Sequence, residues 1–385
     1  MAGGFPEPLA PMLPVLSYQG WSRSVERTSS VFLTEDCCFL HGARYALLTG
    51  SRGMGVSTGD HVLLPAYHCY SIVEPFVQLG CQVEFYKLNP DLSIDLTDLT
   101  SRLRTTTRVV LITHFFAVPQ PMEPLLEVLQ NSQALLIEDC AHAFWGQALG
   151  RPLGSFGAFS VASGKKFFPF EDGGILKFNR QPKQPVLTNE NPAIHNLKLL
   201  VNSLEKSAQY GRLKPLSSIV RCLTEIRKRL KSGPAVRLST ADKETDSMDD
   251  AQNYIDQDLI DRSGSGVSHW LMLHTDLEHL RKRRKENFRY LYSKLNQLEN
   301  FQPLYQGLPD STVPYAFPLL LSNPQKQFPL LKNSGIPMWR WEDVELSHCS
   351  VSRDYRERLI QLPCHQGMKK KELDGILSIF CSELF

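Results

Sequence analysis

The sequence predicts an α/β fold with a large, mostly parallel sheet covered by helices on both faces, followed by a small C-terminal α+β domain. Between about residues 40 and 178, short runs rich in Val, Ile and Leu alternate with helix-length stretches, as is typical of parallel strands buried on both faces. The chain has 385 residues, more than one typical domain. We therefore expect a large domain over residues 1–290, with a variable insert at about 180–262, and a small domain over residues 291–385.

The individual elements follow from apolar runs and their spacing. The expected strands of the large sheet are His61–Pro65, Gln82–Tyr86, Arg108–Thr113, Ala134–Glu138, Ala158–Ala162 and Gly174–Phe178. Helices are expected between them, for example at Ser71–Leu79 and Met122–Gln130. Later helices are expected at Leu197–Tyr210, Ser217–Leu230, His269–Leu298 and Lys371–Leu384, with short strands near Tyr315–Leu321 and Pro337–Trp341. The polar segment 233–252 lacks periodicity and is expected to be mobile.

Composition excludes some classes of function. The formal net charge is only +2, so nothing indicates a nucleic-acid partner. The basic run Arg281–Lys285 lies in a helical pattern with leucines on the opposite face, which predicts a solvated face. No apolar run approaches the ~20 residues that span a bilayer, and the N-terminal stretch lacks the basic region of a signal peptide. Nine irregularly spaced cysteines fit reduced thiols, so we expect a cytoplasmic protein without a membrane partner.

Polar residues follow several expected strands, where chemistry gathers in sheets of this kind. Asp139 and His142 follow the strand ending at Glu138, and Ser163, Lys165 and Lys166 follow the strand ending at Ala162. Taken alone, Asp139 could be a helix N-cap and the lysines a solvated loop. Further groups are Tyr67, His68, Cys69 and Tyr70 after the strand ending at Pro65, and Gly42, Ala43 and Arg44 at a helix start that favours a phosphate.

Together these groups suit pyridoxal 5'-phosphate (PLP). This cofactor needs a lysine amine for its aldehyde, a carboxylate for its pyridine nitrogen, and an aromatic or imidazole group against its ring. It also needs a helix N-terminus for its phosphate. The amine would come from one of the two lysines, the carboxylate from Asp139 and the imidazole from His142. The phosphate site would be at Gly42–Arg44, and the ring face would be covered by Tyr67, His68 or Tyr70. No metal site is expected, because the cysteines have no metal-ligand spacing.

The chain resembles the DegT/StrS family of PLP-dependent sugar aminotransferases, which have the fold-type I aspartate-aminotransferase architecture. The likeness runs through residues 40–178 and resumes more loosely over about 268–385. Five motifs carry the resemblance: the helix start GARYAL at 42–47, GDHVLLPAYHC at 59–69, LIEDCAH at 136–142, SGKK with DGG at 163–174, and LPCHQG at 362–367. In the family, these are the phosphate site, a strand and turn, the pyridine-binding acid, the cofactor lysine with its DGG, and an element before the last helix.

The resemblance assigns roles residue by residue. Lys166 lies six residues before Asp172, a spacing familiar in the family, whereas a spacing of seven would select Lys165. The likeness also implies Asp139 on the pyridine nitrogen, His142 against the ring, Ser163 near the phosphate or imine, and a homodimer. Four departures stand out: Arg44 replaces a threonine or serine, Cys69 replaces the stacking aromatic, His142 replaces a glutamine, and residues 261–268 lack the Asn-Tyr-Arg signature.

The implied activity is transfer of an amino group from a donor, glutamate by family habit, to a keto-sugar or other keto acceptor. A second hypothesis keeps PLP but changes the reaction to that of a lyase, dehydratase or carbon–carbon bond-forming enzyme. A sugar dehydratase of this family would be expected to have His at the lysine position, where this chain has Lys166. A third hypothesis is a non-catalytic PLP-fold regulator. A dinucleotide-binding enzyme is disfavoured because no G-x-G-x-x-G follows a strand.

Overall fold

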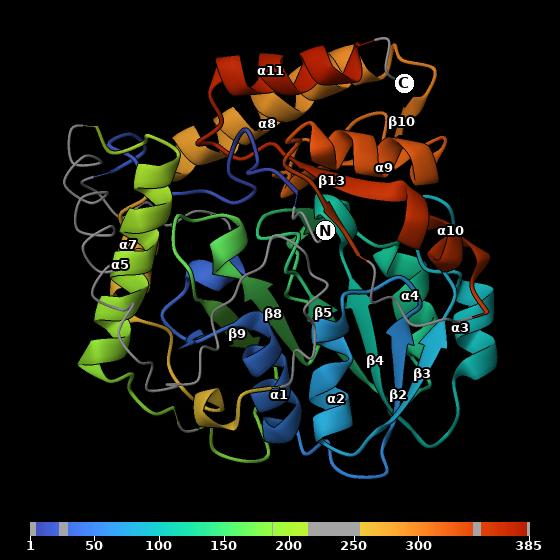
Figure 1. Ribbon diagram of the computed structural model, residues 1–385. Coiled ribbons are helices and arrows are strands. Elements are labelled where there is room, and N and C mark those ends of the chain that lie inside the picture. The colour runs from blue at the N-terminus through green and yellow to red at the C-terminus, as the bar shows by residue number, and fades with distance from the viewer. Residues whose placement is uncertain (1–4, 23–29, 187, 215–254, 342–347, 383–385) are drawn as a thin grey trace, which may run out of the picture.

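The computed structural model describes residues 5–22, 30–186, 188–214, 255–341 and 348–382 (Figure 1). The expected helix Ser217–Leu230 and the expected mobile segment 233–252 lie outside these residues. In Figure 1 the large sheet with its helices lies below a second layer that contains α8, α9 and α11. Among the described residues, no helix has both the length and the apolar character needed to cross a membrane.

The large sheet has seven strands in the order β1-β9-β8-β5-β4-β2-β3. Neighbours from β8 through β5, β4 and β2 to β3 are parallel, which confirms the expected mostly parallel sheet. β9 instead runs antiparallel to β8, and β1, which the sequence did not predict, runs antiparallel to β9. Their bounds are β1 Cys38–Leu40, β2 His61–Pro65, β3 Gln82–Tyr86, β4 Thr107–Thr113, β5 Leu135–Asp139, β8 Phe159–Ser163 and β9 Gly174–Phe178.

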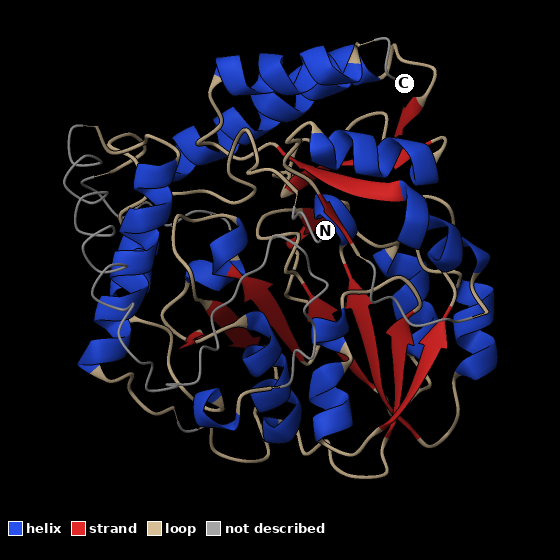
Figure 2. Cartoon of the chain, viewed as in Figure 1, coloured by secondary structure: helices blue, strands red, loops and turns tan. Residues whose placement is uncertain are grey.

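Helices bury both faces of this sheet (Figure 2). Alternate residues of β4 face opposite sides, because side chains of a strand have a period of two. Val109 and Leu111 join a core with α1 and α2, whereas Val110 and Ile112 join a core with α3 and α4. The helix bounds are α1 Ala43–Gly53, α2 Glu74–Gln78, α3 Leu96–Arg102, α4 Met122–Leu129 and α5 Ala193–Gln209.

The C-terminal part contains a four-stranded antiparallel sheet in the order β10-β11-β13-β12. Its elements are β10 Phe301–Pro303, β11 Ala316–Leu321, α9 Pro324–Asn333, β12 Trp339–Arg340, α10 Ser350–Arg358, β13 Leu359–Pro363 and α11 Lys370–Phe380. Phe288 lies before the expected domain boundary and Leu291 lies directly after it, and both pack into the core of this sheet. The expected division at residues 290 and 291 therefore remains a prediction, and the long helix that crosses it belongs to both parts.

The prediction of one long helix over His269–Leu298 was wrong. The chain forms α7 (Gly266–Leu273) and α8 (Leu277–Leu295), separated by a short break. Asp276 starts α8, since its side chain accepts a hydrogen bond from the backbone N–H of His279. An acidic N-cap of this kind accepts a hydrogen bond from a backbone N–H group in the first turn of the helix. In a continuous helix, a backbone carbonyl of the preceding turn would accept that bond.

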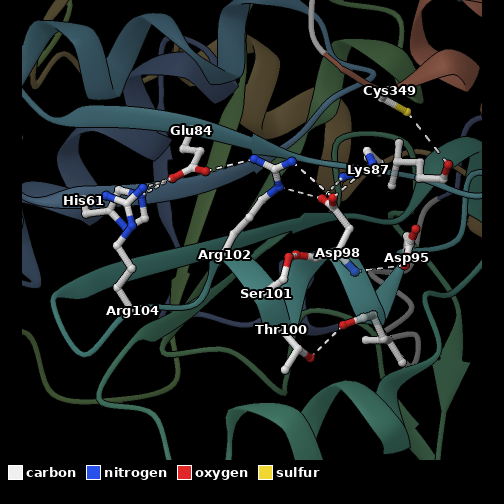
Figure 3. A network of polar contacts seen from close by, with 12 residues as sticks. His61, Glu84, Lys87, Asp95, Asp98, Thr100, Ser101, Arg102, Arg104 and Cys349 are labelled. Atoms are coloured by element: carbon white, nitrogen blue, oxygen red, sulfur yellow. Dashed lines mark hydrogen bonds and ion pairs between the residues drawn. The ribbon is translucent and has the colours of Figure 1, made fainter.

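A charged network joins the edge strand β3 to α3 (Figure 3). Glu84 accepts hydrogen bonds from Arg102 and Arg104 and lies 2.9 Å from His61 Nε2, and Arg102 also binds Asp98. Several of these groups are partly exposed, so each pair contributes little on its own. The network fixes the edge of the sheet farthest from β8 and β9.

Glu138, next to the expected site residue Asp139, has a structural role. Its buried carboxylate accepts hydrogen bonds from the backbone N–H groups of Gly154, Phe156 and Gly157, at 2.6–2.8 Å, and lies 3.2 Å from His114 Nε2. Burial alone would raise the pKa of Glu138, but His114 and the amides of Gly157 and Gly154 outweigh burial and lower it. The carboxylate thus holds the loop before β8 against the end of β5.

We predict that Glu138→Gln destabilises the fold by roughly 2–4 kcal/mol, because an amide cannot accept all of these bonds and leaves buried donors unpaired. Urea unfolding measures the loss. Because the pKa of Glu138 is lowered on folding, its stabilisation is present above the pKa of an unfolded glutamate and is lost as the pH falls through the folded value. The exposed Glu123→Gln is the matched control, and equal stabilities of the two variants would contradict the assigned role.

Candidate functional site

The candidate site lies where the adjacent strands β4, β5 and β8 end. Asp139 is the last residue of β5, and its buried carboxylate accepts hydrogen bonds from Thr113 Oγ1, at 3.2 Å, and from the backbone N–H of Ala141, at 2.9 Å. Burial raises the pKa of Asp139, while the amide of Ala141, the charge of Lys166 and Thr113 partly offset this increase. The position at the end of a buried parallel strand thus leaves a carboxylate that would gain from a cation.

Lys166 ends the turn that follows β8. Its Nζ atom lies 4.9 Å from the centre of the Tyr315 ring, which belongs to the segment before β11. Desolvation lowers the pKa of Lys166 from 10.5 to about 8, and Lys165 lowers it further, whereas Asp139 and Cys69 act in the opposite direction. Lys166 and Asp139 therefore influence each other electrostatically, although no ion pair joins them among the described residues.

His142 lies in a cluster of aromatic rings. Its imidazole stacks on Tyr315 with ring centres 4.5 Å apart, and Trp341 and Phe116 lie at 5.4 and 5.1 Å. Its Nδ1 atom accepts a long hydrogen bond of 3.4 Å from the backbone N–H of Phe116. Burial, and then the charge of Lys166, lowers the pKa of His142 well below its usual value, so the imidazole is neutral at physiological pH.

The double glycine after Asp172 allows two backbones to meet. A Cβ atom on Gly174 would lie 2.1 Å from the carbonyl carbon of Gly42, so no side chain fits there. Gly173 has φ +100° and donates its N–H to the carbonyl of His41 at 2.9 Å. These contacts bring the segment after the lysines directly against the start of α1.

The start of α1 has the features of an anion site. Gly42 is the N-cap and supplies no side-chain cap, and the first turn contains no acidic residue, so the N–H groups and the helix dipole favour an anion. Arg44, which the sequence assigned to a phosphate, makes an ion pair with Glu74 at 2.8 Å. The backbone of residues 42–44 is thus better placed for this role than the guanidinium of Arg44.

Asp172 connects the lysine segment to α7. Its carboxylate accepts hydrogen bonds from the N–H of Ser265 at 2.6 Å and from the hydroxyl of Ser268. Ser265 is in turn the N-cap of α7. The region where the Asn-Tyr-Arg signature was expected therefore serves, within this chain, to bury the acid of the DGG motif.

The contacts of the remaining sequence-predicted residues differ, and those of His68 are with β3 and its own loop. His68 stacks on Phe85 of β3 at 4.7 Å, and its Nδ1 atom faces the carbonyls of Pro65 and Ala66. Tyr67 is fully buried against Trp341, at 4.9 Å between ring centres. Ser163 is buried at the end of β8, and Tyr70 begins a short 3-10 turn.

Sequence reasoning missed the C-terminal contributions to this site. Tyr315 and Trp341 carry no motif, and only the fold brings them to His142 and Lys166. The prediction that Arg281–Lys285 forms a solvated face was also wrong at Arg284, which is completely buried. A leucine pattern on one side of a helix does not exclude a buried arginine that binds internal carbonyls. The signal in the sequence was that Arg284 lies four residues after Leu280 and four before Phe288, and therefore on the same apolar face of the helix.

The donor set fits PLP. A lysine with a lowered pKa and a buried carboxylate lie close enough to act on each other but form no ion pair among the described residues. The start of α1, which has no side-chain cap, lies beside the lysine segment. His114, Glu138 and Cys140 place possible metal-ligand atoms within 4.8 Å of one another. Glu138 and His114 are, however, already engaged by backbone amides and by each other, so this cluster is explained by the hydrogen bonds that stabilise the loop.

The described residues have the fold-type I architecture of PLP-dependent transferases. The sugar aminotransferase CalS13 from Micromonospora echinospora has the same fold, with a TM-score of 0.60 and 15% identity over 97% of this chain and 99% of that chain. AtS13 from Actinomadura melliaura also aligns, with a TM-score of 0.60 and 16% identity over 97% of this chain and 98% of the other.

Residues 34–184 match the model of the DegT/DnrJ/EryC1/StrS aminotransferase family. The GDP-perosamine synthase of Escherichia coli O157:H7 is 27% identical over 35% of this chain and 38% of its own length. An L-glutamine:scyllo-inosose aminotransferase of Streptomyces griseus is 25% identical over 42% of this chain and 39% of its own length. The chain thus spans less than half the length of these curated relatives.

We predict that Lys166→Met stabilises the cofactor-free protein at pH 7, by up to about 3 kcal/mol, because it removes a charge that burial disfavours. The folded pKa of about 8 lies below the usual 10.5, so the penalty is complete below pH 8 and disappears as the pH rises towards 10.5. The gain in stability should shrink over that range. Denaturant unfolding at pH 7 and pH 10 measures it, with Lys165→Met as control, and a gain independent of pH would contradict the assignment.

Proposed function

We propose that this chain is a PLP-dependent aminotransferase that transfers an amino group from an amino acid to a keto group of a sugar or a cyclic polyol. The observation that carries the proposal is that the buried carboxylate of Asp139 and the amine of Lys166, whose pKa is lowered to about 8, act on each other electrostatically without forming an ion pair among the described residues. Perturbed ionisable groups of opposite charge that face one site are typical of catalytic centres. The match of residues 34–184 to the model of an aminotransferase family supports the same activity.

Each residue then has a defined task. Bound PLP would supply the aldehyde and the electron-withdrawing ring on which the amino group is exchanged. Asp139 would hold the ring nitrogen in its protonated state, and the backbone at Gly42–Arg44 would bind the phosphate. Lys166 would provide the amine that holds the cofactor, and its Nζ atom would accept and return a proton when it is released. With a pKa of about 8, about a tenth of Lys166 is uncharged at pH 7, far more than for an ordinary lysine.

His142 would contact the ring as a neutral imidazole. Its lowered pKa keeps it uncharged, so that it does not compete with the protonated ring nitrogen for Asp139. Tyr315 supports the opposite side of His142 and lies beneath the Lys166 ammonium. Cys69, which is partly buried and close enough to influence the pKa of Lys166, takes the place of a stacking aromatic.

The substrates are proposed from the printed names of the relatives. Two of them, from Streptomyces griseus and Streptomyces kanamyceticus, are named for glutamine as donor and an inosose as acceptor, whereas others are named for sugar nucleotides. Glutamate or glutamine is therefore the donor to test first, with a nucleotide-linked keto-sugar or an inosose as acceptor. We also propose a homodimer in the cytoplasm. No disulfide joins the described cysteines, and unbridged cysteines are typical of proteins in reducing compartments.

A PLP reaction other than transamination is the second candidate. A sugar dehydratase of the same fold, ColD, aligns with a TM-score of 0.58 over 89% of this chain and 87% of its own length, at 14% identity. That similarity concerns the fold alone. Lys166 favours transamination because a lysine can both bind the cofactor and return its proton.

The first test separates the two adjacent lysines. Purified protein incubated with PLP and reduced with borohydride should carry a pyridoxyl group on Lys166, as found by peptide mass spectrometry. Lys166→Ala should lose the group and Lys165→Ala should keep it, because Lys166 lies over Tyr315 and interacts with Asp139. A label on Lys165 would overturn the choice of lysine, and a label on neither would overturn the proposed function.

The second test concerns the acid. Asp139→Ala should fold but lose at least about 100-fold in turnover, because the ring nitrogen would no longer be held protonated. Asp139→Asn should be similarly impaired, since an amide cannot stabilise that proton electrostatically. Steady-state assays with glutamate or glutamine measure the loss, with Glu123→Gln as the matched acidic control. Turnover within a few-fold of the parent would remove Asp139 from the mechanism.

A further inference from the structure

The buried side chain of Arg284, on α8, contacts the turn that carries Lys166. Its Nη2 group donates hydrogen bonds to the carbonyls of Lys166, at 2.8 Å, and Phe167, at 3.3 Å. Its Nη1 group donates to the carbonyls of Pro314, at 2.9 Å, and Tyr315, at 3.2 Å. One guanidinium therefore binds both the backbone of the lysine and the backbone of the ring beneath that lysine.

A glutamine completes this arrangement. Gln366 accepts a hydrogen bond from Arg284 Nε at 2.8 Å and donates to the carbonyl of Phe167, also at 2.8 Å. The guanidinium carbon also lies 4.7 Å from the centre of the Phe167 ring. All partners of Arg284 among the described residues are thus uncharged, although burying an unpaired cation is costly. An ordinary internal contact between packed segments would not require such a charge.

The planar guanidinium has a geometric advantage here. Its donors point in fixed directions within one plane, so two carbonyl pairs on different segments can be held at a fixed separation. The Lys166 side chain begins at one of these segments and Tyr315 at the other, and Nζ lies 4.9 Å from the Tyr315 ring. The imidazole of His142 stacks on the ring of Tyr315, with ring centres 4.5 Å apart.

We propose that Arg284 is a positioning residue that fixes the Lys166 turn against Tyr315. By doing so, it keeps the lysine amine buried over the Tyr315 ring and away from water. This proposal rests on the proposed role of Lys166 but concerns the chain's own geometry. Loss of the guanidinium frees the carbonyls of Lys166 and Phe167 to seek water, and the turn moves outwards with the lysine. The groups that act on the Lys166 amine are Asp139, Cys69 and Lys165, with the neutral His142 beside them.

The test is competitive acetylation of the cofactor-free protein across pH, with Lys166 followed by peptide mass spectrometry. The parent should give a labelling midpoint near 8. In Arg284→Gln we expect the midpoint to rise by one pH unit or more, which lowers the labelling rate at pH 8 about fivefold. Arg284→Lys should shift it similarly, because one ammonium cannot bridge four carbonyls, and Gln366→Ala should shift it less in the same direction.

Arg289→Gln is the matched control, because this arginine is exposed on the same helix, and its midpoint should equal that of the parent. If the Arg284 variants do not fold, as judged by circular dichroism, Gln366→Ala alone decides. An unchanged Lys166 midpoint in a folded Arg284→Lys or, failing that, in Gln366→Ala would overturn the proposal. These experiments contain no PLP. A protein that binds no PLP would therefore refute the proposed function and leave the result on Arg284 intact.

Discussion

The site depends on the close approach of the chain after Lys166 to the start of α1. The connection Gly164–Gly173 joins β8 to β9, and it is too short for the crossover that a parallel neighbour would require. β9 must therefore return antiparallel, and Gly174 then meets Gly42 at a distance that admits no side chain. The same constraint places the lysine turn next to the start of α1, which suits an anion. A substitution at Gly174 would thus affect both halves of the site.

The charged residues of the site motifs divide into two groups by their surroundings. Glu138 and Asp172 are surrounded by donors, from the loop before β8 and from the start of α7, and they hold segments in place. Asp139 and Lys166 are instead left in surroundings that disfavour their charges. The structural acids thus stabilise loops, whereas the unfavourable electrostatic energy is confined to Asp139 and Lys166. Such an arrangement is expected where a charged ligand completes the site.

The sequence was sufficient to predict most of the large sheet, because its strands are apolar runs whose order along the chain implies parallel pairing. The bounds of β2, β3 and β9 agree with the expectation. Asp139, His142 and Lys166 could be found for a related reason, since each lies at the end of a strand or three residues after it. The reversed direction of β9, by contrast, depended on the length of a connection, and the break before α8 depended on one capping residue, Asp276.

The parts that sequence reasoning missed come from long-range contacts. Tyr315 and Trp341 lie far along the chain from Lys166 and have no spacing that marks them. Arg284 was misjudged because an amphipathic pattern describes the average of a helix face, whereas burial of one arginine depends on carbonyls from two other segments. Arg44 fits the phosphate motif by position, yet a glutamate thirty residues later in the chain, Glu74, binds it. Such pairings are properties of the folded structure.

Spectrophotometric titration of the purified protein with PLP tests the central claim most directly. The account predicts a visible absorption band that saturates at one PLP per chain, disappears in Lys166→Ala, and is bleached by glutamate or glutamine and restored by a keto acceptor. A band that no amino acid bleaches would contradict transamination. Failure of the protein to develop any band would contradict the assignment of this site to PLP.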